Sequence, residues 1–240
     1  MRSRQASAFA VLLLCAGVSW AAAGGEAQTS ALPSGAERRI GTVRFRQGTA
    51  VYSVLFTPDG SGLLSSADDG SICSWDLQAG HASRTVRTRN RGRCGLDRSA
   101  DGSKVIATTN IGTSHIYDAK TWKLAESLDS CGGSRGAVAF SPDGKRVATG
   151  GYGRHIWDAA NGKKLATLED NAGDYLCALA WSPDGKHVAA CGREESTIFD
   201  AQTGDMFLWL AEGRCQHAAY SPDGKLVAGA FPDGRVEVWD

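Results

Sequence analysis

A four-residue phrase, Ser-Pro-Asp-Gly, constrains the fold of this 240-residue chain more than any other feature. With small changes the phrase occurs five times, 39 to 42 residues apart, beginning at Thr57, Ser99, Ser141, Ser182 and Ser221. An aromatic residue followed by Asp recurs at similar intervals, with the aromatic at Trp75, Tyr117, Trp157, Phe199 and Trp239. Two marks that share a period of about 40 residues predict five copies of one structural unit.

Each copy of the unit is predicted to hold four short strands. An apolar run, such as 136–140, precedes the phrase, in which Pro presets φ and Gly takes the left-handed conformation of a hairpin turn. A second strand follows, then a third strand that ends at the aromatic-Asp pair, and a fourth strand completes the unit. Because four short strands cannot bury both faces alone, we expect an all-β fold in which the sheets stack against one another.

These turns and aromatic-Asp pairs resemble the WD-repeat family of β-propellers, and the resemblance covers residues 38–240. It implies a β-propeller of five four-stranded blades. The repeats are degenerate, because the family's Gly-His pair is absent before every first strand and the Asp before the third strand is clear only as Asp69 and Asp233. The family's buried network of Asp, His, Ser and Trp is therefore expected to be incomplete in every blade. The second repeat diverges most, with Asp97 and Arg98 where the other copies carry Ala and an aromatic.

The last unit lacks a fourth strand, since the chain ends on Trp239-Asp240. Residues 38–45, "RRIGTVRF", directly precede the first strand of the first unit and can supply it. A ring closed in this way has five complete blades and no open edge. The resemblance supports such closure, because the family commonly closes its ring with a strand from the opposite terminus. Two alternatives stay open: a fragment of a larger ring, or an arc that another chain completes.

The first residues have the layout of a secretory signal peptide. Positive charge in 1–4 precedes the apolar run 8–18, and small residues follow it. An apolar run of eleven residues is short for a helix that must span about 30 Å of hydrocarbon, so a retained anchor is the less favoured interpretation. We therefore predict a signal peptide over 1–23, a flexible segment over 24–37, and an exported, periplasmic or extracellular protein without a membrane span after cleavage.

The cysteines permit disulfides in an exported protein, because an oxidising compartment preserves them. If Ser182 pairs with Lys186 across its turn, Cys177 lies opposite Cys191 on the neighbouring strand. Opposed residues are about 4.5–5.5 Å apart at Cβ, so a strained Cys177–Cys191 bridge is one option. Two small buried thiols are the favoured one. The sequence has no Cys-x-x-Cys pair, and no zinc site is predicted.

The strongest local charge lies in 84–93, which holds five arginines and no acid. We predict that this cluster binds an acidic protein surface or another anionic macromolecule through Arg87, Arg89, Arg91 and Arg93. The alternative is a solvated strand face and loop. Aromatic residues do not alternate with the arginines, and the formal net charge is +0, so specific nucleic-acid binding is not expected.

The sequence contains no nucleophile elbow, phosphate loop or metal motif, and we predict no catalytic, cofactor or metal site. The favoured interpretation is a monomeric, non-catalytic scaffold propeller that mediates protein–protein interaction outside the cytoplasm. The main alternative is a propeller enzyme or small-ligand binder with a site in a central channel. Only Asp97, Arg98 and His217 stand out on the innermost strands. Trp122 and Trp209 lie off the repeat register, as partner anchors or edge-packing residues.

Overall fold

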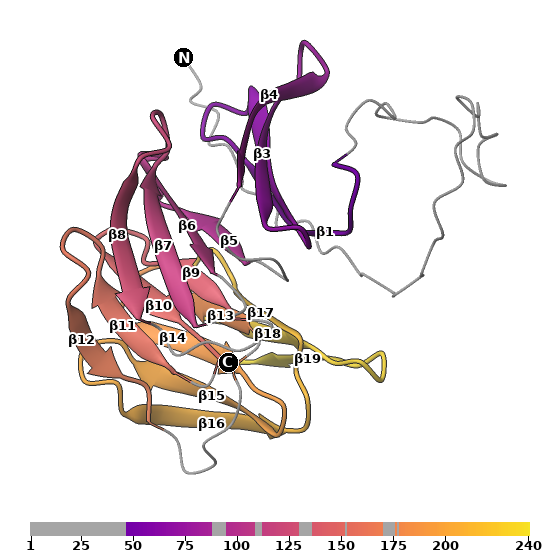
Figure 1. Ribbon diagram of the computed structural model, residues 1–240. Coiled ribbons are helices and arrows are strands. Elements are labelled where there is room, and N and C mark those ends of the chain that lie inside the picture. Colours follow the sequence, from indigo (N-terminus) through magenta and orange to yellow (C-terminus); the bar gives the residue numbers. More distant parts are fainter. Residues whose placement is uncertain are drawn as a thin grey trace, which may run out of the picture. The chain divides into compact units, whose positions relative to one another are not determined.

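The computed structural model describes residues 47–87, 95–108, 112–129, 136–151, 153–169, 176 and 178–240. All of them belong to one compact unit, Thr42–Asp240, and they form nineteen strands and no helix (Figure 1). The described residues include no helical segment with the length and apolarity that a membrane crossing needs. The predicted signal peptide, flexible segment and closing strand, 1–23, 24–37 and 38–45, lie outside the described residues.

The strands form five antiparallel sheets in chain order, each a simple meander. The first sheet is β1 (Val51–Phe56), β2 (Gly62–Ala67), β3 (Ser71–Asp76) and β4 (His81–Arg87). The second is β5 (Leu96–Arg98), β6 (Lys104–Thr108), β7 (Thr113–Asp118) and β8 (Leu124–Asp129). The third is β9 (Val138–Phe140), β10 (Arg146–Thr149), β11 (His155–Asp158) and β12 (Lys164–Thr167). The fourth is β13 (Ala178–Trp181), β14 (His187–Cys191), β15 (Glu195–Asp200) and β16 (Met206–Glu212). The fifth has three described strands, β17 (His217–Tyr220), β18 (Val227–Ala230) and β19 (Val236–Trp239).

This arrangement confirms the predicted all-β fold of five blades, and the first strands of consecutive sheets contact one another as the blades of a propeller do. The fourth strand of the last blade stays a prediction, because its residues are not among those described.

The repeated phrase forms the same hydrogen-bonded turn in all five sheets. In the third sheet, Ser141 Oγ donates to Asp143 Oδ1 at 2.6 Å and accepts from the Arg146 amide at 2.9 Å. Asp143 also accepts from the Lys145 amide, and these bonds, the one from Ser141 first, hold the pKa of its carboxyl below the usual value. Gly144 has a φ of 68°, the left-handed conformation that Gly adopts without strain. The predicted hairpin turn is thus confirmed.

The turn closes one residue later than expected, and this changes the cysteine pairing. Ser182 pairs with His187, not with Lys186, through a backbone bond of 2.9 Å. The register therefore places Ala178, not Cys177, opposite Cys191. Cys191 instead forms a disulfide with Cys215. The Cys177–Cys191 bridge considered as an option is therefore wrong, and so is the favoured expectation of a free buried thiol at Cys191. Cys177 itself lies outside the described residues.

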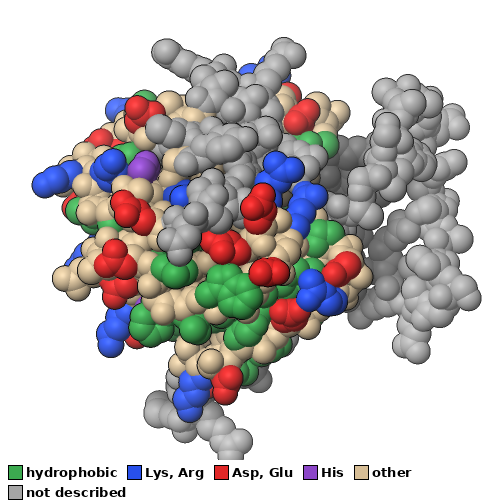
Figure 2. Space-filling view, turned by 90° about the horizontal axis from the view of Figure 1, so that it is seen from below, with side chains coloured by type: hydrophobic (Ala, Val, Ile, Leu, Met, Phe, Trp, Pro, Cys, Tyr) green, Lys and Arg blue, Asp and Glu red, His purple; other side chains and the backbone are tan. Residues whose placement is uncertain are grey.

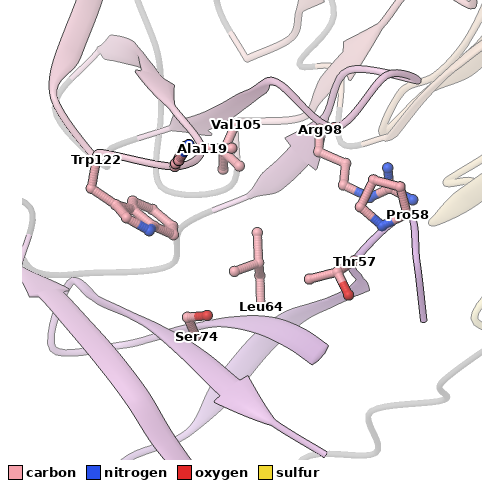
Figure 3. Close-up of a pocket in the computed structure, with 10 residues that line it drawn as sticks. Thr57, Pro58, Leu64, Ser74, Arg98, Val105, Ala119 and Trp122 are labelled. Atoms are coloured by element: carbon pink, nitrogen blue, oxygen red, sulfur yellow. The ribbon is translucent and has the colours of Figure 1, made fainter. Parts of the chain in front are cut away.

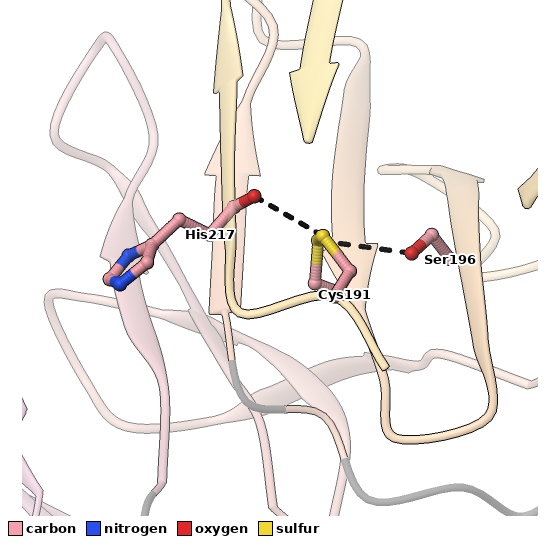
Figure 4. The surroundings of a disulfide bond; sticks show 4 residues. Cys191, Ser196 and His217 are labelled. Atoms are coloured by element: carbon pink, nitrogen blue, oxygen red, sulfur yellow. Dashed lines mark hydrogen bonds between the residues drawn. A yellow bond between two sulfur atoms is a disulfide. The ribbon is translucent and has the colours of Figure 1, made fainter. Parts of the chain in front are cut away.

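The disulfide joins the fourth sheet to the segment that leads into the fifth (Figure 4). Its two Cα atoms are 5.1 Å apart. Ser196 Oγ donates to Cys191 Sγ at 3.9 Å, and Cys215 Sγ lies 3.2 Å from the His217 carbonyl oxygen. Both cysteines are buried in an apolar cluster with Ala211.

The core lies between consecutive sheets, as the repeated aromatics predict. The aromatic that closes a repeat packs against the preceding sheet, and Trp157 of the third sheet shares a cluster with Ile116 and Leu128 of the second. The equivalent residues of the second, fourth and fifth sheets are Tyr117, Phe199 and Trp239. Burying one such side chain stabilises the fold by about 1.5–3 kcal/mol.

Lys and Arg side chains at equivalent positions of two repeats also donate hydrogen bonds from one sheet to the next. Lys104 Nζ of β6 donates to the Ala159 carbonyl in the third sheet at 2.7 Å. One repeat later, Arg146 Nη1 of β10 donates to the Ala201 carbonyl in the fourth sheet at 3.0 Å. Both cations follow the turn directly, so the same local structure positions both ties.

The first sheet contains a side-chain network that we did not expect. Trp75 Nε1 donates to Ser65 Oγ at 2.7 Å, and Ser65 Oγ donates to Gln47 Oε1 at 2.5 Å. Gln47 Nε2 donates in turn to Ser71 Oγ at 2.9 Å, and that hydroxyl donates to Asp69 Oδ1 at 2.6 Å. An amide can both accept and donate, so Gln47 links the Trp to the Asp in a blade without the family's His.

Candidate interaction surfaces

Asp97 and Arg98, the two unusual residues of β5, connect the second sheet to both of its neighbours. Asp97 Oδ2 accepts from the Phe140 amide of the third sheet at 2.6 Å. Arg98 points the other way, and its Nε donates to the Phe56 carbonyl of the first sheet at 2.7 Å. Burial raises the pKa of the Asp97 carboxyl to about 6, although the amide bonds from Phe140 and Arg98 oppose the rise. Both side chains therefore take part in packing between sheets.

The structure does not gather the unusual inner-strand residues into one site. Asp97 is directed to the third sheet, Arg98 to the first, and His217 is exposed at the start of β17 in the fifth. Within the described ranges, no group of three or more His, Cys, Asp or Glu residues is placed to hold a metal ion.

A cavity of about 220 Å³ lies between the first and second sheets (Figure 3). Arg98 and Trp122 lie at opposite ends of it, with Leu64 between them. Its other lining residues are Thr57, Pro58, Ser74, Gly102, Val105, Ala119 and Lys120. Since Arg98 already donates to the Phe56 carbonyl, the cavity's main cation belongs to the contact between the sheets.

Trp122 adopts a left-handed backbone conformation, with a φ of 58°. The equivalent residue of three other sheets is a glycine, at Gly80, Gly162 and Gly204, and all four amides donate to the carbonyl of the repeat's Asp. A side chain in this conformation costs about 1–2 kcal/mol. The indole packs against Tyr117, with ring centroids 6.1 Å apart, and against the core between the first two sheets. For Trp122 the structure favours edge packing over a partner anchor.

A second cavity, of about 470 Å³, lies between the turns of the fourth and fifth sheets. Its lining residues are Ser182, Pro183, Asp184, His187, Tyr220, Asp223 and Gly224. Burial, and then the charge of Asp184, raise the pKa of Tyr220 to about 12. Both carboxylates accept bonds from the serines of their own turns, so the cavity is a by-product of two neighbouring hairpins.

The predicted arginine cluster is described only at its beginning. Arg87 ends β4, lies opposite Ser71 and is exposed, and Arg84 on the same strand is exposed as well. Hydrogen bonds from Ser71, and to a smaller extent the charge of Arg87, hold the pKa of Asp69 below its usual value. Arg89, Arg91 and Arg93 lie outside the described residues, so the cluster as a binding site stays a prediction.

Trp209 stands out in the sequence, but the exposed strand around it was not predicted. On β16, the outermost strand of the fourth sheet, four consecutive apolar residues are exposed, at 43, 61, 43 and 47% for Met206, Phe207, Leu208 and Trp209. On the face that carries this strand, apolar side chains gather, with both acidic and basic side chains around them (Figure 2). The run "MFLWL" after the aromatic-Asp pair could have indicated this exposed apolar strand, because the fourth strand of each unit is the outermost.

Sequence comparison agrees with this geometry. Residues 40–76, 128–158 and 162–199 match the family model "WD domain, G-beta repeat", and each stretch holds one turn phrase and one repeat aromatic. Three stretches of the chain thus match WD repeats. WD repeats are typical of propellers that bind other proteins and do no chemistry. The second sheet falls largely outside the matched stretches, in keeping with the divergence around Asp97 and Arg98, and the fifth sheet falls wholly outside them.

One curated relative is Protein tipD of Dictyostelium discoideum, 21% identical over 210 residues. The match covers 80% of this chain and 33% of tipD. The chain thus spans about a third of the length of that relative.

Replacing Asp97 with Asn is expected to remove the loss of unfolding free energy that occurs when the buried Asp97 carboxyl ionises. The pKa is about 6 in the folded protein, above the unfolded value near 3.9, so the stability of the wild type falls as pH rises through 6. Relative to Asp97→Asn, the wild type should lose about 2 kcal/mol of unfolding free energy between pH 4.5 and pH 7.5. Urea unfolding of both proteins at the two pH values measures this. A difference that stays constant with pH would show that Asp97 titrates as an exposed carboxyl.

Proposed function

We propose that this chain is a non-catalytic binding module that acts outside the cytoplasm and holds another protein, or an anionic macromolecule, on the surface of its blades. The WD repeats support a scaffold role. The observation that carries the proposal is the basic β4, whose Arg84 and Arg87 are exposed at the start of an arginine-rich stretch. Basic side chains on one segment attract acidic partners and accelerate their association. Neither nucleic acid nor self-association is part of the proposal.

Two features support a location outside the cytoplasm. Residues 1–23 have the charge, apolar run and small residues of a signal peptide. The Cys191–Cys215 disulfide joins the fourth sheet to the segment before the fifth, and disulfides form and persist mainly in oxidising compartments.

If the chain is exported, the protein isolated from the envelope or secreted fraction of its source should begin near residue 24. Digestion without reductant should then release a linked pair of peptides that contain Cys191 and Cys215. N-terminal sequencing and peptide mass analysis measure both. An intact N-terminus together with two free thiols at these cysteines would contradict export.

The binding role is tested with residues 24–240 as bait and a variant in which Arg87, Arg89, Arg91 and Arg93 become Ser. A crosslinking pull-down from the envelope and secreted fraction should recover a discrete protein with the wild type and lose most of it with the variant. An Arg→Lys variant at the same four positions keeps the charge and should retain the partner.

The matched control removes four positive charges elsewhere, by changing the exposed Lys123, Lys163, Lys164 and Lys225 to Ser. Loss of the partner with this control as well would show that net charge, and not the arginine cluster, directs binding. If no protein saturates a well-folded wild-type bait, the scaffold proposal fails.

A further inference from the structure

The outermost strand of the fourth sheet differs from its equivalents in three other sheets. The equivalents of β16 are β4, β8 and β12. β4 exposes no large apolar side chain, β8 exposes only Leu124, and β12 exposes only Leu165. β16 exposes four in succession. Natural edge strands are commonly protected by charged residues or Pro, as by the arginines of β4, yet β16 carries no charge between Met206 and Ala211.

β16 also has an open backbone edge among the described strands, where it pairs only with β15. The register places Trp209 and Met206 opposite Thr197 and Phe199 on one face and Leu208 opposite Ile198 on the other. Exposed apolar side chains therefore lie on both faces of this edge. An added strand would hydrogen-bond to the open edge and pack its own alternating side chains against both faces.

The strand is held at both ends. Before it, the Glu169 amide donates to the Gly204 carbonyl at 3.1 Å, which fastens its start to the third sheet. After it, the Gly213 amide donates to the Glu194 carbonyl at 2.6 Å, and the Cys191–Cys215 disulfide follows. A preformed strand loses little conformational entropy when a partner binds.

Acidic residues at both ends of β16 indicate the charge of the partner. Asp205 precedes the strand and is exposed. Its backbone forms an isolated parallel β-bridge with Glu169, which is also exposed. Glu212 ends the strand, exposed and opposite Glu195. Antiparallel pairing of two copies of β16 would set Asp205 of one near Glu212 of the other, and like charges in such positions are destabilising. Arg193 and Arg214 are close in sequence to the second end, where Glu194, Glu195 and Glu212 outnumber them.

We propose that the open edge of β16 is a docking site for an extended protein segment that has alternating apolar residues and a Lys or Arg at each end. The segment adds to the fourth sheet as a fifth strand. Its apolar side chains cover Met206 and Trp209, which share a face of β16 because they lie opposite Phe199 and Thr197. Its intervening side chains lie over Leu208 on the other face, and its cations meet Asp205 and Glu212. This proposal rests on the proposed function only in that both are binding roles, since the arginine cluster is a separate surface.

The test uses a fluorescent peptide, KKVTVTVKK, and the mature chain, residues 24–240. Fluorescence anisotropy should show saturable binding, weakened about tenfold or more by the double variant Phe207→Ser, Trp209→Ser. The matched control, Leu124→Ser with Leu165→Ser, removes similarly exposed apolar residues from two other outer strands and should bind as the wild type does. Circular dichroism confirms that both variants keep their sheets.

Three further comparisons distinguish an extended cationic segment from other peptides and from a second copy of the chain as the occupant of the β16 edge. A peptide with Pro in place of its central Val cannot complete the backbone pairing and should bind weakly. A peptide flanked by Glu should bind the Asp205→Lys, Glu212→Lys variant better than the wild type. Equal binding of all peptides, or unchanged binding by the Phe207 and Trp209 variant, would overturn the proposal. A concentration-dependent dimer in sedimentation, abolished by that variant, would make a second copy the occupant and would also overturn it.

The outcomes also separate this proposal from the function proposed above. If the peptide does not bind but a partner is lost with the arginine variant, only the β16 site fails. If the peptide binds at β16 while the arginine variant keeps every partner, only the arginine cluster fails.

Discussion

A hydrogen bond from a hydroxyl to a carboxylate, repeated in five turns, is the interaction on which the rest of the structure depends. In each turn the Ser or Thr hydroxyl donates to the Asp two residues later, and the same oxygen accepts the amide five residues later. This second bond fixes the register of the first two strands, and a register error of one residue would turn every side chain of a strand to the other face. Trp157 and its equivalents reach the preceding sheet only because that register is correct.

The ties between the sheets explain why we place recognition on the outer strands. Polar side chains near the inner strands are used within the protein: Asp97 and Arg98 bond to neighbouring sheets, and Lys104 and Arg146 reach carbonyls of the next sheet. The outer strands differ strongly from blade to blade, basic on β4 and apolar on β16, although the rest of each repeat is similar. Variation on a constant frame is what a set of binding surfaces requires.

The sequence predicted the architecture well, because its turns and aromatics are local features with one period. It could not predict Gln47 as a network member, since that residue precedes the first strand and belongs to neither repeated mark. The predicted position of Cys177 opposite Cys191 was wrong by one residue of strand register. The observed partner of Cys191 is Cys215, and that pairing depends on how two sheets pack. Trp122 was unexpected because only the structure shows a Trp in the backbone position where other blades use Gly. The exposure of β16 likewise depends on which strand is outermost.

The central claim, that one turn builds all five sheets in the same way, is tested most directly by hydrogen–deuterium exchange of the folded protein. The amides to follow are those bonded to the turn hydroxyls, at Gly62, Lys104, Arg146, His187 and Leu226. We predict that all five exchange slowly, at rates comparable to those of the central strands. If any of them exchanged as fast as in an unfolded peptide while its neighbouring strands stayed protected, the turn would not set the register of that sheet.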